Sequence, residues 1–132
     1  MNEKLKPVYL AGPIESCTDK ENYGWRIFAQ RFLDRPVIIP DVVKEESDDY
    51  MNSIIIPDKK LILSSRVVLA NCWKISAGTS MEILFAWEKK IPVITIGDHL
   101  ISINPWISGH STHVMKDLSY ACTFINEEYS DE

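Results

Sequence analysis

Short apolar segments recur along this chain and alternate with longer segments whose apolar residues have helical spacing. The short segments predict five buried strands, at residues 8–12, 37–40, 67–71, 91–97 and 112–114. Strands that are apolar on both faces are typical of a parallel sheet covered by helices on both sides. Because crossovers between parallel strands are right-handed, we expect one α/β domain over residues 1–132, with a doubly wound, mostly parallel five-stranded sheet of flavodoxin-like or Rossmann-like order.

The segments between the strands predict helices, at residues 20–34, from about Pro57 onward, at 78–90 and at 116–128. Thr18 and Asp19 offer an N-cap for the first helix, and Pro57 suits the first turn of the second. In the first helix we expect a core-facing stripe formed by Trp25, Phe28, Ala29 and Phe32. We expect loops over the acidic residues 45–52, with room for one helical turn, and over residues 99–111.

The composition is typical of a soluble globular domain, with 45% hydrophobic and 25% charged residues among 132. A net charge of −5 without a basic stripe argues against a nucleic-acid duplex as a partner. No apolar run approaches the length of a membrane span, and the polar residues 1–6 do not form a signal peptide. Three widely spaced cysteines without a CxxC pattern fit a reducing compartment, so we expect a cytoplasmic protein with no membrane partner.

Ligands of open α/β sheets bind beyond the carboxyl ends of the strands, where the strand order reverses. This rule selects three segments of the chain, at residues 12–16, 71–82 and 97–106. The GxGxxG, Walker A, HExxH and GxSxG motifs are absent from the sequence. His110 and His113 lie three residues apart without a ligand cluster around them, so we expect no metal ion and no cofactor.

Two carboxylates are the candidates for chemistry at this crevice. Glu82 lies near the start of an apolar helix just after a buried strand, and Asp58 lies near the start of the preceding helix. Such a pair suits reaction at an acetal-like carbon, where one carboxylate attacks and the other manages a proton. Burial would raise the pKa of Glu82, and the helix N-terminus and a tyrosine hydroxyl would offset the rise. The pattern alone is explained more simply by acids that stabilise the first turns of two helices.

Four sequence blocks follow one another along the chain: residues 8–14 (VYLAGPI), residues 58–71 with Asp58, Ile62, Ser65 and the run VVLAN, residues 78–82 (GTSME) and residues 92–94 (PVI). In this order and at this spacing the blocks resemble those of the nucleoside 2-deoxyribosyltransferase family, including the related deoxynucleoside 5′-monophosphate N-glycosidases. The resemblance extends over about residues 7–97 and more loosely through residues 106–110. The third block is similar to the block that carries the family's nucleophile.

This resemblance implies an exchange at the anomeric carbon with retention of configuration. Glu82 would attack C1′ of a 2′-deoxyribose and expel the nucleobase, and another base or water would then take the sugar from the glycosyl-enzyme. Asp58 would give the leaving base a proton or a hydrogen bond. Tyr9 would orient Glu82 through its hydroxyl, or would only pack as a core aromatic. Gly12 would let the backbone approach the ligand, or would only form a turn.

Ser76 bears on the choice of substrate, because the resemblance implies aspartate there in transferases of free nucleosides and serine in hydrolases of 5′-monophosphates. Ser76 and the backbone at Gly78 could cradle a 5′-phosphate at the helix N-terminus, and an N-cap role explains Ser76 equally well. Met81, next to Glu82, is expected to line the substrate site. Asn104 stands where the transferases place an asparagine that closes over the sugar of a neighbouring subunit, and it is alternatively a turn residue.

We therefore expect cleavage of the N-glycosidic bond of a 2′-deoxynucleoside or its 5′-monophosphate, with transfer of deoxyribosyl to another nucleobase. Hydrolysis of a deoxynucleoside monophosphate is the alternative, and it rests on Ser76. A non-catalytic nucleotide-binding module is an alternative of another class, against which the presence of both Glu82 and Asp58 counts. The expected partners are a deoxynucleoside or deoxynucleotide, a nucleobase, and further copies of the chain that share the site through Asn104. Ser65-Arg66 replaces the family's usual Ser-Asp, at a position expected to be remote from the crevice.

Overall fold

Five parallel strands form one sheet in the computed structural model, which describes residues 5–40 and 49–130. The strands are β1 Val8–Ala11, β2 Val37–Ile38, β3 Val67–Asn71, β4 Val93–Ile96 and β5 His113–Met115. Their order across the sheet is β2-β1-β3-β4-β5, the flavodoxin-like order of a doubly wound sheet. The predicted fold class is confirmed, and the predicted strand ends differ from the observed ones by no more than two residues.

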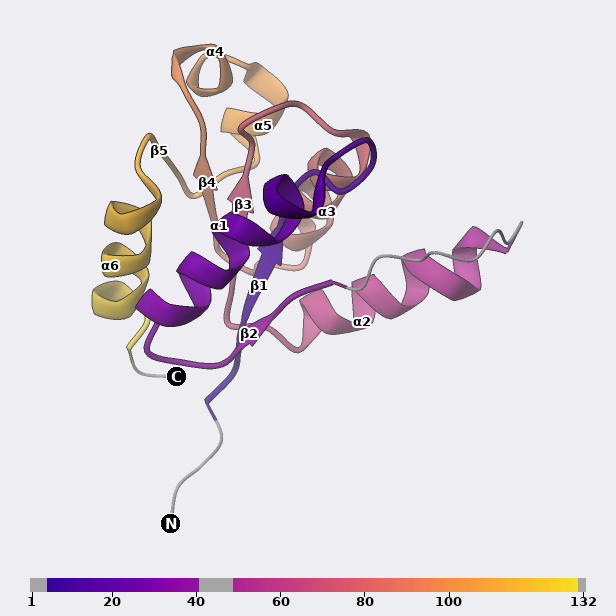
Figure 1. The fold of residues 1–132 in the computed structure, drawn as a ribbon, viewed down its shortest axis with the longest axis horizontal. Coiled ribbons are helices and arrows are strands. Elements are labelled where there is room, and N and C mark those ends of the chain that lie inside the picture. The colour runs from indigo at the N-terminus through magenta and orange to yellow at the C-terminus, as the bar shows by residue number, and fades with distance from the viewer. Residues whose placement is uncertain (1–4, 41–48, 131–132) are drawn as a thin grey trace.

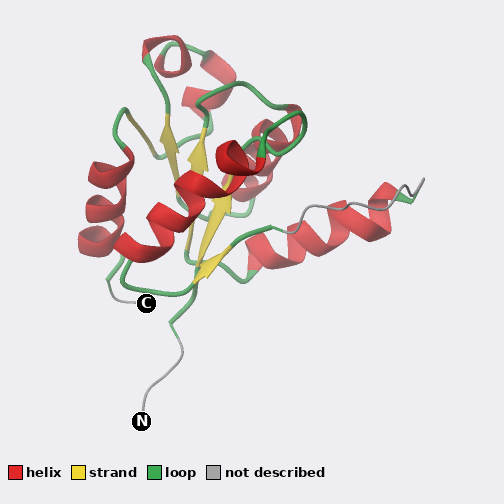
Figure 2. Cartoon of the chain, in the orientation of Figure 1, coloured by secondary structure: helices red, strands yellow, loops and turns green. Residues whose placement is uncertain are grey.

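Helices cover both faces of the sheet (Figures 1 and 2). α1 Asp19–Phe32 and α6 Leu118–Glu128 pack on one face, and α2 Ile56–Leu63 and α3 Ala77–Glu88 pack on the other. A π-helix, η1 Met51–Ile55, runs directly into α2, and Figure 1 shows this arm pointing outward from the sheet. Two short helices, α4 His99–Ser102 and α5 Pro105–Gly109, lie beyond the carboxyl end of β4 (Figure 1).

Strand β1 divides its side chains between two hydrophobic clusters, one on each face of the sheet. Val8 and Leu10 pack in the cluster that includes residues of α1 and α6. Tyr9 and Ala11 pack in the cluster that includes residues of α2 and α3. All four side chains are fully buried, as the alternation of side chains along a strand between two covered faces requires. The alternation therefore places Tyr9 on the α3 side of the sheet.

The carboxyl ends of β1 and β3 lie side by side at the switch in strand order. Ala11 of β1 pairs with Ala70 of β3, and β1 leads to β2 on its other side. The segments that leave these two strands, which begin at Gly12 and at Cys72, therefore start next to each other. This is the position at which doubly wound sheets bind their ligands.

The predicted irregular loop over residues 99–111 is wrong, because this segment contains α4 and α5. Asp98 and Asn104 each accept hydrogen bonds from two backbone N–H groups of the helix that follows. These caps satisfy donors that a short helix leaves free, and the buried Ile101 and Ile107 dock the two helices on the core. Helices this short show little apolar periodicity, so the capping residues Asp98 and Asn104 were the sequence feature that could have predicted them.

The predicted core stripe of α1 is partly wrong. Phe32 is 53% exposed and stacks on the partly buried Phe28, with 4.3 Å between the ring centroids. The buried face of α1 and its C-cap consists instead of Asn22, Arg26, Ala29 and Leu33. These four positions follow the spacing of three and four residues that places side chains on one helix face. The buried stripe thus contains a charged residue, Arg26.

The segment between β2 and β3 carries the predicted acidic loop. Residues 45–48 of that loop lie outside the described residues. Residues 51–55 form the π-helix η1, a longer helical stretch than the single turn expected up to Asn52. Pro57 occupies the first turn of α2, where its missing N–H costs no hydrogen bond, in agreement with the prediction.

Candidate active site

The side chains of Tyr9 and Glu82 meet on the α3 side of the sheet. Tyr9 Oη donates a hydrogen bond of 2.5 Å to Glu82 Oε2, although the residues are 73 positions apart in the chain. This distance is within the range of a charge-assisted O–H···O⁻ bond. The ring of Tyr9 packs in the core while its hydroxyl reaches the carboxylate.

Glu82 lines a cavity of about 550 Å³ between α3 and the η1–α2 arm. Asp58 of α2 lines the same cavity, so the structure brings the two predicted carboxylates to one site. Most of the remaining wall is apolar and includes Met51, Ile54, Ile55, Ile62, Leu84 and Phe85. A concave, largely apolar cavity with a few polar groups is the usual form of a small-molecule site.

Burial raises the pKa of Glu82 to about 7. The hydrogen bond from Tyr9 lowers this pKa, the negative charge of Asp58 raises it, and the positive charge of Arg26 lowers it. Removal of water disfavours the charged carboxylate, and the tyrosine and arginine restore part of the lost stabilisation. Glu82 therefore titrates near neutral pH, the range in which a carboxylate serves as a nucleophile or an acid–base group.

Tyr9 remains protonated and therefore remains a donor to Glu82. Burial raises the pKa of the Tyr9 phenol far above its ordinary value, and the negative charge of Glu82 and the hydrogen bond to it raise that pKa further. A phenolate facing a carboxylate would place two buried negative charges together, which a site poor in water disfavours. Tyr9 thus fixes one oxygen of Glu82 and leaves the other oxygen for chemistry.

Arg26 is a residue of the site that the sequence prediction missed. It lies fully buried in α1 and interacts electrostatically with Glu82. The prediction placed the buried stripe one residue away, at Trp25. The helical spacing that leads from Ala29 back through Arg26 to Asn22 was the signal that could have revealed it.

Gly12 packs closely against α1, whereas Gly78 lines the cavity. A Cβ at Gly12 would lie 2.7 Å from Trp25 Cζ2 and 3.3 Å from Arg26 Nη2, so a side chain there would displace α1 residues. Gly12 is therefore required for space and not for an unusual backbone conformation. Gly78 lines the cavity with open space at its Cα, and the predicted site residue Met81 lines the same cavity.

Ser76 and Asn104 both serve as helix N-caps and do not line the Glu82 cavity. Ser76 Oγ accepts a 3.3 Å hydrogen bond from the backbone N–H of Thr79 in α3. Asn104 caps α5 and lines a smaller cavity of about 280 Å³, whose wall includes Met81 and Leu84. Within one chain, the structure therefore does not bring Asn104 to the two carboxylates.

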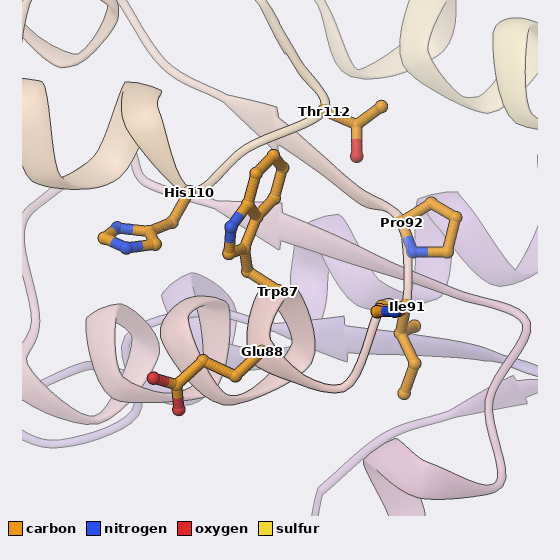
Figure 3. Close-up of a pocket in the computed structure, with 7 residues that line it drawn as sticks. Trp87, Glu88, Ile91, Pro92, His110 and Thr112 are labelled. Atoms are coloured by element: carbon orange, nitrogen blue, oxygen red, sulfur yellow. The ribbon is translucent and has the colours of Figure 1, made fainter.

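A third cavity, of about 730 Å³, lies at the C-terminal end of α3, and neither Glu82 nor Asp58 lines it. Figure 3 shows Trp87 of α3 beside His110, with Pro92 and Thr112 across the opening. The rings of Trp87 and His110 meet edge to face, with 6.2 Å between their centroids. The cavity offers aromatic walls without the acid pair, so it is not the candidate active site.

Residues 5–40 and 49–130 contain no cluster of three or more His, Cys, Asp or Glu side chains suited to a metal ion. In the same residues, no helix has the length and apolar character needed to cross a membrane.

Arg66 lies at the amino end of β3, where its backbone N–H bonds the carbonyl of Pro7 and its guanidinium covers the Tyr129 ring. It is therefore at the opposite end of β3 from the crevice.

Fold and site together define a doubly wound α/β protein with a partly buried, tyrosine-bonded glutamate that shares a cavity with a second carboxylate. No protein-family model matches the chain, and no curated protein matches it. Solved structures do match. The 2-deoxyribosyltransferase of the psychrotolerant bacterium Bacillus psychrosaccharolyticus is 17% identical, with a TM-score of 0.68, and the match covers 94% of this chain and 93% of that one.

A conserved protein from Enterococcus faecalis V583 is similar to the same degree. It is 18% identical, with a TM-score of 0.67, and the match covers 93% of this chain and 98% of that one. At these identities the comparisons establish a shared fold over nearly the whole chain. The predicted α/β architecture is thus found in solved proteins, one of which is a 2-deoxyribosyltransferase.

The buried carboxylate of Glu82 should lower the stability of the folded chain above neutral pH. Its folded pKa of about 7 exceeds its ordinary value of 4.5, so the folded state retains a proton that the unfolded state has released between these pH values. The free energy of unfolding therefore falls as pH rises across this window. Urea unfolding should show Glu82→Gln to be more stable than the parent at pH 8, by about 3 kcal/mol, and equal to it near pH 4.

Glu127→Gln is the matched control, because Glu127 is exposed on α6 and far from the cavity. This variant should leave the free energy of unfolding unchanged at both pH values. Equal stability of Glu82→Gln and the parent at pH 8 would show that Glu82 is not held in a desolvated site.

Proposed function

We propose that this chain cleaves the N-glycosidic bond of a 2′-deoxyribonucleoside or its 5′-monophosphate through a covalent glycosyl–Glu82 intermediate, and transfers the deoxyribosyl group to another nucleobase. The observation that carries this proposal is the partly buried Glu82, bonded to Tyr9, in one cavity with Asp58. The sequence blocks similar to those of nucleoside 2-deoxyribosyltransferases support it. The fold shared with a 2-deoxyribosyltransferase supports it as well.

The first step is attack of a Glu82 carboxylate oxygen on C1′. The bond from C1′ to the base nitrogen breaks, its electron pair leaves with the base, and Asp58 supplies a proton or hydrogen bond to that base. A nitrogen of the second base then attacks C1′ and its N–H proton passes to Asp58, the ester bond to Glu82 breaks, and the carboxylate is restored. Two displacements on the same carbon retain its configuration, as in retaining glycosidases.

The surroundings of Glu82 suit this chemistry. Attack requires the carboxylate, and a pKa of about 7 leaves a large fraction of Glu82 ionised at neutral pH. The hydrogen bond from Tyr9 fixes Oε2, so the geometry presents the remaining oxygen. Most of the cavity wall is apolar and offers few groups that would hold a water molecule in place, which favours a nucleobase over water as the acceptor of the sugar.

Hydrolysis of a deoxynucleoside 5′-monophosphate is the second candidate, and Ser76 favours it. Ser76 caps the N-terminus of α3, a helix of 12 residues whose dipole and free N–H groups attract anions. An aspartate at this position would repel a phosphate group, whereas serine would not. In this case water, and not a second base, takes the sugar from Glu82.

Base exchange separates these candidates. A free deoxynucleoside and its 5′-monophosphate are each incubated with the protein, with and without an acceptor base, and products are followed by chromatography. The primary proposal predicts exchange on the free nucleoside, dependent on the acceptor. Base release from the monophosphate alone, independent of the acceptor, would replace transfer by hydrolysis.

The variant Glu82→Gln should lower the rate of either reaction by roughly a thousandfold or more, because it removes the nucleophile. Glu127→Gln, on the exposed face of α6, should react like the parent. If Glu82→Gln retains the parental rate, the covalent mechanism is wrong. If the parent binds deoxynucleotides without releasing base from any of them, the chain is a non-catalytic binding module.

We further propose that a second copy of the chain completes the site through Asn104. The cavity that Asn104 lines also contains Ile75, which is 66% exposed, Met81 at 70% and Trp106 at 74%. Such exposed apolar side chains gathered around one cavity are typical of an interaction surface. Asn104 and the Glu82 cavity are joined through Met81, which lines both.

Mixing two inactive variants tests the shared site. Asn104→Asp keeps a side chain that caps α5 and loses the amide, and Glu82→Gln loses the nucleophile. Each variant alone should be inactive, and a mixture refolded together should recover activity, because mixed oligomers contain sites with neither substitution. Absence of recovery, or a fully active monomer in analytical ultracentrifugation, would contradict the shared site.

A further inference from the structure

Arg26 is a positive charge buried completely beneath the candidate site. Its Nε donates to the carbonyl of Leu10 at 3.2 Å, and its Nη2 donates to the carbonyl of Gly12 at 3.0 Å. Its Nη1 donates to the carbonyl and to the side-chain oxygen of Asn22, at 2.7 and 2.6 Å. All four acceptors are uncharged oxygens, so these hydrogen bonds satisfy the guanidinium donors without neutralising the charge.

The charge of Arg26 is balanced through space, chiefly by Glu82. Burial lowers the pKa of Arg26, and among the groups that counteract this effect the carboxylate of Glu82 contributes most. The interaction is reciprocal, because Arg26 lowers the pKa of Glu82. A buried charge without a compensating charge is costly, so the two groups stabilise one another's ionised forms.

Arg26 also anchors the end of β1. Of its two carbonyl acceptors, Leu10 directly follows Tyr9 in the chain and Gly12 lies three residues after it. The guanidinium therefore ties the end of β1, and the turn that follows, to α1. Little space remains at this contact, because a Cβ at Gly12 would lie 3.3 Å from Arg26 Nη2.

We propose that Arg26 is a positioning residue of the site, whose guanidinium anchors the end of β1 that carries Tyr9 and supplies the buried positive charge that holds Glu82 as a carboxylate. This role rests on the proposed function for its catalytic consequence. Arg26 does not touch the cavity; it acts through Tyr9 and Glu82. The buried guanidinium thus keeps a desolvated nucleophile ionised without forming an ion pair at the reacting oxygen.

The charge of Arg26 bears on both steps of the proposed reaction. In the first step it favours the anionic form of Glu82 that attacks C1′. When the glycosyl ester forms, Glu82 loses its charge and Arg26 is left without its principal counter-charge. The second step restores that charge, so the buried guanidinium favours departure of the carboxylate and keeps the ester from becoming a stable end point.

Arg26 is one of several charged or titratable groups that lie around Glu82 and its cavity. Asp58 on α2 opposes ionisation of Glu82, and Tyr9 on β1 favours it. Lys59 on α2 and Glu88 on α3 also line the cavity, and the ammonium of Lys59 lies 5.1 Å from the centroid of the Phe85 ring. Of the groups that lower the pKa of Glu82, Arg26 is the one that carries a positive charge.

Direct titration of Glu82 tests the proposal without requiring any enzymatic activity. The side-chain carboxyl signals of ¹³C-labelled glutamate are followed by NMR against pH in the parent, with Glu82→Gln identifying the Glu82 signal. In Arg26→Gln, the pKa of Glu82 should lie about one pH unit above the parental value. In Arg26→Lys, which keeps the charge, it should lie closer to the parental value.

Arg35→Gln is the matched control for loss of a buried arginine. Arg35 is also buried, and it donates to the carbonyls of Lys6 and Tyr129, at the amino end of the sheet. Its replacement should cost hydrogen bonds of the same kind and leave the pKa of Glu82 unchanged. An unchanged pKa in Arg26→Gln, or an equal rise in Arg35→Gln, would overturn the proposal.

A second measurement uses no arginine variant, so it holds if Arg26→Gln fails to fold. The ¹⁵N–¹H signal of Arg26 Nε should move in the parent as Glu82 ionises near pH 7, and that movement should be lost in Glu82→Gln. The signal of Arg35 Nε is the internal reference and should not follow Glu82. An Arg26 signal that ignores the Glu82 titration would overturn the coupling.

The pH profile of base release then connects the role to catalysis. Arg26→Gln should be about tenfold slower than the parent at pH 6 and should approach it at alkaline pH, since one pH unit in pKa changes the ionised fraction about tenfold. A chain without activity would refute the proposed function and leave the NMR test intact. A loss that is equal at every pH would overturn the charge role of Arg26.

Discussion

One hydrogen bond, from Tyr9 to Glu82, joins the first strand of the sheet to the helix that follows the third. The parallel sheet makes this contact possible, because β1 and β3 are neighbours with their carboxyl ends aligned. Alternation along β1 sends Tyr9 to the face that α3 covers. The ring fills the core, so the hydroxyl has one fixed position, and Glu82 is held at that position. The geometry of the site is therefore a consequence of how the core packs.

The ionisation of Glu82 follows from a balance of opposed effects. Burial and Asp58 raise its pKa, whereas Tyr9 and Arg26 lower it, and the result lies at about 7. Without the two lowering groups, burial would keep the carboxyl protonated and unable to attack a carbon centre. Without burial, the carboxylate would be solvated and less reactive. Arg26 lowers the pKa of Glu82 without occupying the cavity, because α1, which carries it, covers the other face of the sheet.

Much of this site could be predicted from the sequence. The apolar strands predict the parallel sheet, and the position of Glu82 at a helix start just after β3 places it at the crevice. Asp58 could be predicted only at the start of the preceding helix, and its place in the Glu82 cavity follows from how the η1–α2 arm packs beside α3. Arg26 could not be predicted by composition, because charged residues are rarely buried and its helix has apolar neighbours at similar spacing. Asn104 illustrates another limit. Its capping role follows from local sequence, but any role in a second chain's site depends on an interface that one sequence does not specify.

The proposed mechanism requires a covalent bond between Glu82 and the sugar. The most direct test is rapid acid quenching of the protein during turnover of a 2′-deoxynucleoside or its 5′-monophosphate, followed by mass spectrometry of its peptides. Covalent catalysis predicts a transient deoxyribosyl adduct, with phosphate in the case of the monophosphate, on the peptide that contains Glu82 and on no other. Base release at the steady-state rate without any such adduct, or an adduct on a different residue, would rule out Glu82 as the nucleophile.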